Sequence, residues 1–145
     1  MRGCDRNGDG YGLRIDAAAE VLAANQAFYD AFEARDLDAM SDVWERSERA
    51  TCTHPGWATL RGWGKVASSF FTLFTGPQRV QFVLTDAHVE VEGRVGWVSL
   101  DENLLGDQGG ATVAALNTFC YDPATERWRL VAHHGSVVSA EGLSG

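Results

Sequence analysis

Residues 27–40 read AFYDAFEARDLDAM and hold the end of one predicted helix and the start of the next. The first helix is predicted to begin near Asp16, a good N-cap residue before three alanines, and to end near Arg35. One face of this helix carries Val21, Asn25, Phe28 and Phe32. Their intervals of three and four residues predict an amphipathic helix that packs this face against a core.

Two further segments downstream have helical spacing. Asp36 is placed to cap a short second helix, and a third helix is predicted over 62–74, ending before Gly76-Pro77. Between them, residues 49–53 predict a short strand that leads into the turn at 54–56, where proline and glycine follow a histidine. The inward faces are Leu37, Met40, Val43 and Trp44 on the second helix, and Val66, Phe70, Phe71 and Phe74 on the third.

Beyond residue 79 the period of the apolar residues changes from 3.6 to 2, which is typical of strands. Four long strands are predicted, over 80–91, 94–105, 111–121 and 127–138. The alternation breaks around Asp86, which predicts a β-bulge. Helices first and a meander of strands afterwards indicate an α+β fold. We expect one domain over 16–138, with a flexible tail at 1–15 and a frayed end at 139–145.

The composition is that of an ordinary globular protein, at 45% hydrophobic and 22% charged residues. A net charge of −8 disfavours nucleic acid and anionic membrane surfaces as partners, because both attract clustered Lys and Arg. No apolar run is long enough for a transmembrane helix, and the polar N-terminus does not resemble a signal peptide. We therefore expect a cytoplasmic protein.

The last two predicted strands carry apolar residues on both faces. On the third strand, Leu116 and Cys120 alternate with Ala115 and Phe119. One face must pack against the helices, so the other needs a cover as well. The simplest cover is the sheet of a second subunit, which predicts a homodimer through this face.

Three stretches resemble the SnoaL-like and ketosteroid-isomerase-like families of the nuclear transport factor 2 (NTF2-like) superfamily. They are the opening run 27–40, the His-Pro-Gly turn at 54–56 followed by a helix start at Gly62, and the final strand at 128–136. The resemblance covers residues 17–138. It implies a cone in which three N-terminal helices pack on a strongly curved, mixed or antiparallel sheet that encloses an apolar pocket.

The resemblance also places candidate catalytic residues. His54 matches the carboxylate base that precedes a proline in steroid isomerases of this fold, and an imidazole with its ordinary pKa near ~6.5 suits proton transfer at neutral pH. Asn117 matches a protonated aspartic acid, and a donor to an oxyanion is worth roughly 3–4 kcal/mol. Phe28 matches a tyrosine and can donate nothing. Tyr29 lies about 100° further round the helix and is predicted to point elsewhere.

Strand parity extends the candidate site. With Asn117 facing inward, the predicted inner face of the last strand includes His134, and His133 lies on the opposite face. Glu102 is expected on the inner face of its strand, and Trp57 at the entrance. The expected ligand-binding residues are Phe28, Trp44, Trp57, Phe70, Phe82, Glu102, Phe119 and His134.

Each polar candidate also has a structural interpretation. His54 can cap the turn that Pro55 forces, and Asn117 can satisfy a neighbouring backbone group. Glu102 and His134 can form an ion pair or a hydrogen bond with no role in ligand binding. The sequence leaves these alternatives open.

A metal or another cofactor is not expected. The His and Glu residues lack HxH or HExxH spacing, which would place two ligands on one face. The segment from Asp5 to Gly10 matches the front of an EF-hand loop, with Asp16 at the twelfth position. However, Gly12 replaces the usual aliphatic residue, and only four residues precede the loop. A tail is the favoured interpretation, and calcium binding is left open.

Two classes of function follow. The first is a small-molecule-binding protein that acts as a cofactor-free isomerase, cyclase or dehydratase, in which His54 moves a proton and Asn117 polarises the carbonyl of an apolar compound. The second is a non-catalytic ligand-binding or dimerisation domain, which the phenylalanine at position 28 favours.

Overall fold

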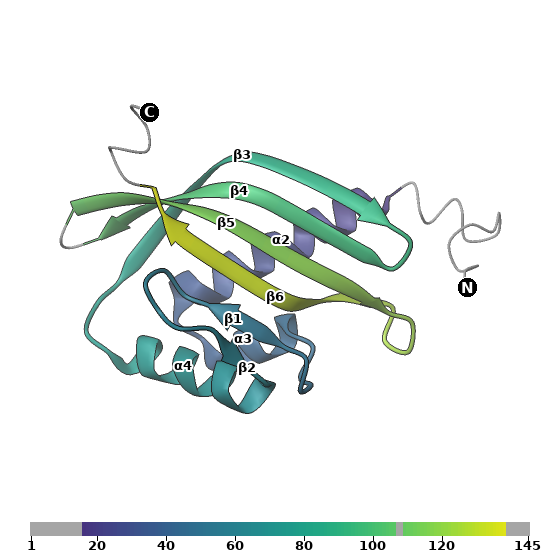
Figure 1. Cartoon of the computed structure of the whole chain (residues 1–145), viewed down its shortest axis with the longest axis horizontal. Helices are drawn as coiled ribbons and strands as arrows, with labels where there is room; N and C mark the ends of the chain where they lie inside the picture. Colours follow the sequence, from purple (N-terminus) through teal and green to yellow (C-terminus); the bar gives the residue numbers. More distant parts are fainter. Residues whose placement is uncertain (1–15, 107–108, 139–145) are drawn as a thin grey trace.

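The structure is a computed structural model that describes residues 16–106 and 109–138. The predicted tail at 1–15, with its EF-hand-like segment, and the predicted frayed end at 139–145 lie outside the described residues. Three helices and a six-stranded mixed sheet form the predicted α+β fold. The sheet is curved and does not close on itself (Figure 1).

The helices are α2 (Ala17–Ala34), α3 (Leu37–Val43) and α4 (Trp63–Thr75). Helix α2 ends at Arg35, whose left-handed φ of 56° turns the chain, and the Asp36 side chain accepts a 3.1 Å bond from the Ala39 amide to cap α3. The predicted helix ends are therefore confirmed to within a residue or two. The strands are β1 (Thr51–Thr53), β2 (Leu60–Arg61), β3 (Val80–Glu92), β4 (Val95–Gly106), β5 (Gly109–Asp122) and β6 (Arg127–Val137).

The strand order is β2-β1-β6-β5-β4-β3, and every pair is antiparallel except β1 with β6. Helix α2 lies across one face of the long strands, behind them in Figure 1, whereas α3, α4, β1 and β2 gather alongside β6. The parallel pairing of β1 with β6 places Cys52 opposite His133. This pairing places β1 beside the middle of β6 and brings Pro55, in the turn after β1, next to Gly135.

Two bulges change the parity of the strands. One lies between Thr85 and His88, where Asp86 has a φ of 58°, so the predicted bulge in β3 is confirmed. The second was not predicted. Phe119 pairs with Leu130 and Thr118 pairs with Ala132, so Val131 has no partner on β5. Every residue of β6 after Val131 therefore lies on the opposite face of the sheet from the one that uninterrupted alternation would give it.

The core between α2, α4 and the sheet is aromatic. Phe28 is completely buried and lies at the centre of this core. Its ring makes edge-to-face contacts at centroid distances of 4.9–6.4 Å with Tyr29, Phe32, Trp44 and Phe70. This geometry suits the ring quadrupoles and adds to the burial of large apolar area.

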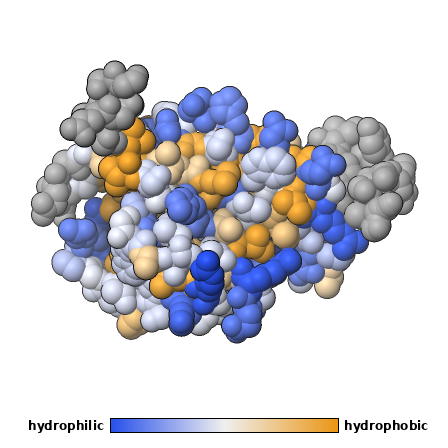
Figure 2. Space-filling model, viewed as in Figure 1, coloured by the Kyte–Doolittle hydropathy of each residue, from blue (hydrophilic) through white to orange (hydrophobic). Residues whose placement is uncertain are grey.

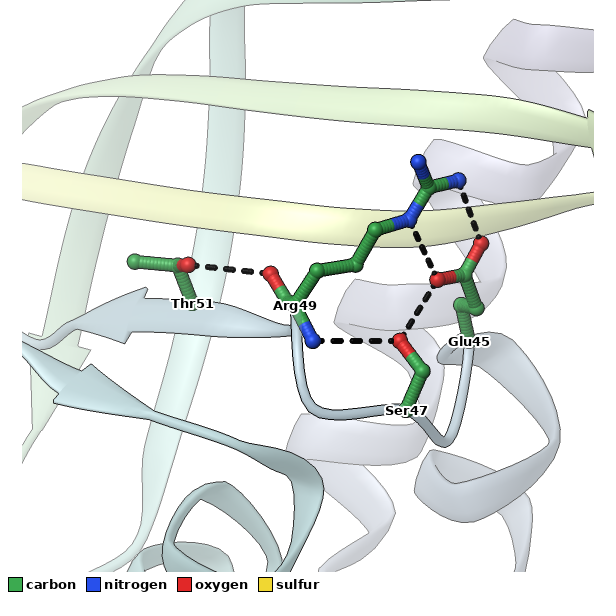
Figure 3. A network of polar contacts seen from close by, with 4 residues as sticks. All are labelled: Glu45, Ser47, Arg49 and Thr51. Carbon is green, nitrogen blue, oxygen red and sulfur yellow. Dashed lines mark hydrogen bonds and ion pairs between the residues drawn. The ribbon is translucent and has the colours of Figure 1, made fainter.

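Two arginines fix the connections between elements. The Arg35 guanidinium donates to the carbonyls of Phe74, Gly76 and Gln78, where α4 ends, and so ties the end of α2 to the end of α4. Arg49 forms a two-point ion pair with Glu45, at 2.7 and 2.8 Å (Figure 3). That pair is exposed, so it orders the loop before β1 and contributes at most about 1 kcal/mol.

The face of the sheet opposite α2 has no cover. Leu116 is 45% exposed there and Val83 is 49% exposed. Figure 2 shows apolar groups scattered among hydrophilic side chains over this face. No helix of the described residues is long and apolar enough to cross a bilayer.

Close packing of α2 on β4 generates a stability prediction. A Cβ atom added at Gly96 would lie 2.7 Å from Val21 Cγ2, so Gly96→Ala must displace the helix or strain the strand. We expect this substitution to lower the free energy of unfolding by about 1–3 kcal/mol, measured by urea denaturation. The control is Gly64→Ala in α4, where the added atom meets nothing within 4 Å and no loss is expected. Equal losses in the two variants would contradict this account.

Candidate functional site

A cavity of about 280 Å³ opens between the ends of α2 and α4, the turn after β1 and the inner face of the sheet. This volume lies at the small end of the range for ligand sites. Its walls are mainly apolar and aromatic: Phe32, Trp57, Leu73, Phe74, Phe82 and Leu104. Three buried polar side chains, His54, Glu102 and His133, also line it.

Glu102 is the ionisable group of the cavity whose pKa is shifted toward neutral pH. It lies on the inner face of β4, after Val98 and Leu100, and is 3% exposed. Burial raises the pKa of this carboxyl from its ordinary 4.5 to about 7, although the hydrogen bond from Tyr29 opposes part of the change. At neutral pH Glu102 is therefore divided between acid and carboxylate, which suits a group that moves protons.

Tyr29 connects Glu102 to a buried network. Its hydroxyl donates to Glu102 Oε2 at 2.5 Å and accepts from Asn117 Nδ2 at 3.1 Å. Burial and the nearby Glu102 carboxylate raise the pKa of Tyr29, so the phenol stays protonated and remains a donor. Asn117 Nδ2 also donates to Asn25 Oδ1 at 2.8 Å, and its Oδ1 lies 2.5 Å from His133 Nδ1. Both amide hydrogens of Asn117 are thus used within the protein.

His133 is held as a neutral acceptor. Burial, with smaller contributions from His54 and His134, lowers its pKa to about 3. The carbonyl oxygen of Asn117 can only accept, so the proton of the His133 ring resides on Nδ1. The other ring nitrogen, Nε2, keeps its lone pair and has no partner among the described residues.

His54 has the same character. Burial lowers its pKa to about 4, so the ring is neutral at pH 7. The Ser69 hydroxyl donates to the Val66 carbonyl at 2.7 Å and must therefore accept from His54 Nε2–H, at 2.9 Å. Nδ1 of His54 is then the acceptor nitrogen. Trp57 stands edge-on against this ring, at a centroid distance of 4.8 Å.

The structure divides the expected site residues into three groups. His54, Trp57, Phe82 and Glu102 line the cavity. A second group lies in the core and does not line it: Phe28, Trp44, Phe70, Asn117 and Phe119. The third is His134, which is exposed, so its predicted inward orientation is wrong. The unpaired Val131 reverses the parity of β6, and His133 takes the inward position instead.

The prediction that Tyr29 points away from the site is also wrong. The buried face of α2 is wide enough to hold both aromatic residues: Phe28 faces α4 and Tyr29 faces the sheet, where its ring lies 5.0 Å from that of Phe82. A signal was available in the sequence, because Asn25 and Tyr29 lie four residues apart and so share a helix face. Two polar residues on a buried face require partners.

The raised pKa of Glu102 predicts a pH-dependent stability difference. Between about pH 4.5 and about pH 7, folded Glu102 holds a proton that the unfolded chain has released, so its contribution to stability falls as the pH rises. Glu102→Gln lacks this loss. We expect the unfolding free energy of the variant, minus that of the wild type, to grow by up to roughly 3 kcal/mol from pH ~5 to pH ~8.

Urea denaturation at the two pH values measures this difference. The lowered pKa values of His54 and His133 make stability rise with pH up to about 6.5, but both proteins share this contribution, so it cancels in the difference. Glu90→Gln, on the exposed side of β3, is the charge-matched control and should show no such growth. If the difference in unfolding free energy between Glu102→Gln and the wild type is the same at both pH values, Glu102 does not have a raised pKa in the folded protein.

Two solved structures share 34% of their sequence with this chain. One is a candidate dehydratase of the NTF2-like family from Streptomyces avermitilis, with a TM-score of 0.80 over 88% of this chain and 99% of that one. The other is a candidate association domain of calcium/calmodulin-dependent protein kinase type II from Thiobacillus denitrificans, with a TM-score of 0.69 over 81% and 94%. Both share the α+β architecture described above.

A curated relative is more distant. F-box protein SKIP8 of Arabidopsis thaliana is 25% identical over 118 residues, which are 81% of this chain and 49% of that protein, so the chain spans about half the length of this relative. The model of the SnoaL-like domain matches residues 21–140, from helix α2 to the end of the sheet. This match covers most of the chain, and the protein belongs to the SnoaL-like domain family of NTF2-like folds.

Proposed function

We propose that this protein binds a small, largely apolar β-hydroxy carbonyl compound in the cavity and catalyses the elimination of water from it. The observation that carries the proposal is Glu102, a carboxyl buried in an aromatic cavity with a pKa of about 7. The 34% identity to a candidate dehydratase, along nearly all of that chain, supports this class of reaction.

The proposed elimination uses one carboxyl group twice. Ionised Glu102 takes the proton from the carbon next to the carbonyl, and the electron pair of that C–H bond becomes the new C=C bond. The C–O bond to the hydroxyl group breaks, and the leaving oxygen takes the proton back from Glu102 to form water. The carboxylate is restored, and no electrons are gained or lost.

The neighbouring groups hold the carboxyl and the substrate. The Tyr29 hydroxyl fixes one oxygen of Glu102 and leaves the other to act. The neutral ring of His54 or of His133 accepts the one hydrogen bond that the substrate hydroxyl can donate. With its pKa at about 4, His54 is too weak a base to take the proton from carbon at neutral pH. Glu102 therefore takes the role of general base that was first expected of His54. Asn117 acts as a positioning residue for Tyr29 and His133.

Dehydration of 3-hydroxy-1-phenylbutan-1-one, followed by the ultraviolet absorbance of the enone, tests this proposal. Glu102→Gln should lower kcat by roughly 10²–10⁴, because the amide cannot move a proton. The wild-type rate should rise with pH to a plateau above about 7. Glu90→Gln should retain the wild-type rate. Absence of turnover by the wild type over a panel of β-hydroxy ketones, or full turnover by Glu102→Gln, would exclude the proposed reaction.

A second candidate function is self-assembly through the sheet. The face opposite α2 leaves Leu116 and Val83 exposed, and the 34% identity to a candidate kinase association domain favours a role in assembly. We propose a homodimer in which two such faces meet. This candidate is compatible with a ligand in the cavity, which lies on the other side of the sheet.

The sheet face can be tested separately from the cavity. Leu116→Lys places a charge at the middle of the proposed interface and should shift the protein from dimer to monomer in size-exclusion chromatography with light scattering. The matched control is Phe71→Lys on α4, which replaces a residue that is 57% exposed but lies away from the sheet. A wild-type monomer at all concentrations, or a dimer insensitive to Leu116→Lys, would contradict the interface.

A further inference from the structure

We propose that the cavity is a selective site for organic ammonium ions, that is, for a protonated amine attached to a small apolar body. The inference rests on the proposed function only in placing a small molecule in the same cavity. It concerns which ligands the cavity prefers, and it stands or falls separately from the elimination of water.

The first observation is that the buried polar side chains of the cavity offer acceptors. The ring proton of His54 is donated to Ser69, and that of His133 is donated to Asn117. Each neutral ring therefore has one remaining nitrogen, which carries a lone pair; that of His54 lies 3.9 Å from the Cys52 thiol, a weak donor. Glu102 has one oxygen bound by Tyr29 and the other oxygen without a partner among the described residues.

The second observation is that the donors behind the cavity are already used. The Tyr29 hydroxyl donates to Glu102, and the two Asn117 amide hydrogens go to Asn25 and Tyr29. Once Glu102 is ionised, the buried polar side chains of the cavity offer a carbonyl oxygen only acceptors, which cannot bond to it, and the side-chain donors Trp57 and Gln78 belong to exposed residues of the lining. A ligand that carries N–H or O–H groups would satisfy the buried acceptors.

The third observation concerns charge. The ionisable groups that face Glu102 are Tyr29 on α2, Cys52 on β1, His54 in the turn and His133 on β6. All four are neutral at pH 7, since burial raises the pKa of the Cys52 thiol to about 12 and the histidines are held neutral.

Among the described residues, Arg35 is the one cation that lines the cavity, and its guanidinium donates to the three carbonyls at the end of α4. Within residues 16–106 and 109–138, Glu102 makes no ion pair. An ionised Glu102 is thus a buried charge without a counterion, and a cationic ligand would supply one.

The cavity walls favour the same ligand. The rings of Phe32, Trp57, Phe74 and Phe82 surround the space, and aromatic faces attract ammonium groups. The chain as a whole carries a net charge of −8, which attracts cations from solution. An alcohol would only donate a hydrogen bond to the acceptors. A protonated amine would donate hydrogen bonds as well and would also be attracted by the charge of Glu102 and by the aromatic rings. The amine is therefore the preferred class.

Three ligands with one carbon skeleton test the proposal: 1-phenylethylamine, 1-phenylethanol and acetophenone. Their polar groups are a cationic donor, a neutral donor and an acceptor. By isothermal titration calorimetry at pH ~8, we expect the amine to bind at least about tenfold more tightly than the ketone, with the alcohol between them. From pH ~6 to pH ~8 the affinity for the amine should rise about tenfold as Glu102 ionises, and that for the alcohol should change little.

The variants assign the preference to one residue. Glu102→Gln should lower the affinity for the amine at least about tenfold and leave the alcohol within about twofold, and Glu90→Gln should match the wild type. Equal affinities for amine and ketone in the wild type, or an amine affinity that Glu102→Gln does not lower, would overturn the proposal. If Glu102→Gln does not fold, the affinities of the wild type for the three ligands at pH ~6 and pH ~8 test the proposal without the variant. Turnover of β-hydroxy ketones is a separate measurement, so either idea can fail while the other holds.

Discussion

The site depends on one constraint, which is the removal of water from the carboxyl group of Glu102. A carboxylate in apolar surroundings loses the hydration that stabilises its charge, and a single bond from a phenol replaces only part of it. The position of Tyr29, the bonding of Asn117 and the neutral state of both histidines can all be understood as the surroundings that make such burial tolerable. A polar network of this kind is stable only when every member has a partner.

The fold provides these partners from elements far apart in the chain. Asn25 and Tyr29 come from the first helix, Glu102 and Asn117 from adjacent strands, and His133 from the last strand. Placing five polar groups in a core has a cost in free energy, which the surrounding aromatic packing offsets. A domain of this size can therefore hold a reactive group and remain folded, provided that the rings around Phe28 stay closely packed.

The order of the elements could be predicted from the sequence because it depends on periodicity, which is a local property. The caps at Asp36 and Arg35 and the bulge at Asp86 each leave a mark in the spacing of neighbouring residues. Glu102 could be placed on the inner face for the same reason, since its strand alternates without interruption.

The parts that escaped prediction leave no such local mark. Around Val131, apolar residues occupy both faces of the strand, so the sequence does not reveal where the alternation changes. The side on which Tyr29 lies depends on where the sheet crosses the helix, and that is decided by long-range packing. The use of both hydrogens of Asn117 within the core likewise depends on partners up to 92 residues away in sequence.

The extra residue in β6 has a wider meaning for how such a site changes over time. Adjacent imidazoles at positions 133 and 134 occupy opposite sides of one ribbon, and the length of the strand before them selects which one is enclosed. Loss or gain of a single codon there would exchange the inner and outer sets of side chains over the rest of the strand. The set of side chains that β6 contributes to the cavity therefore depends on the length of the strand as well as on residue identity.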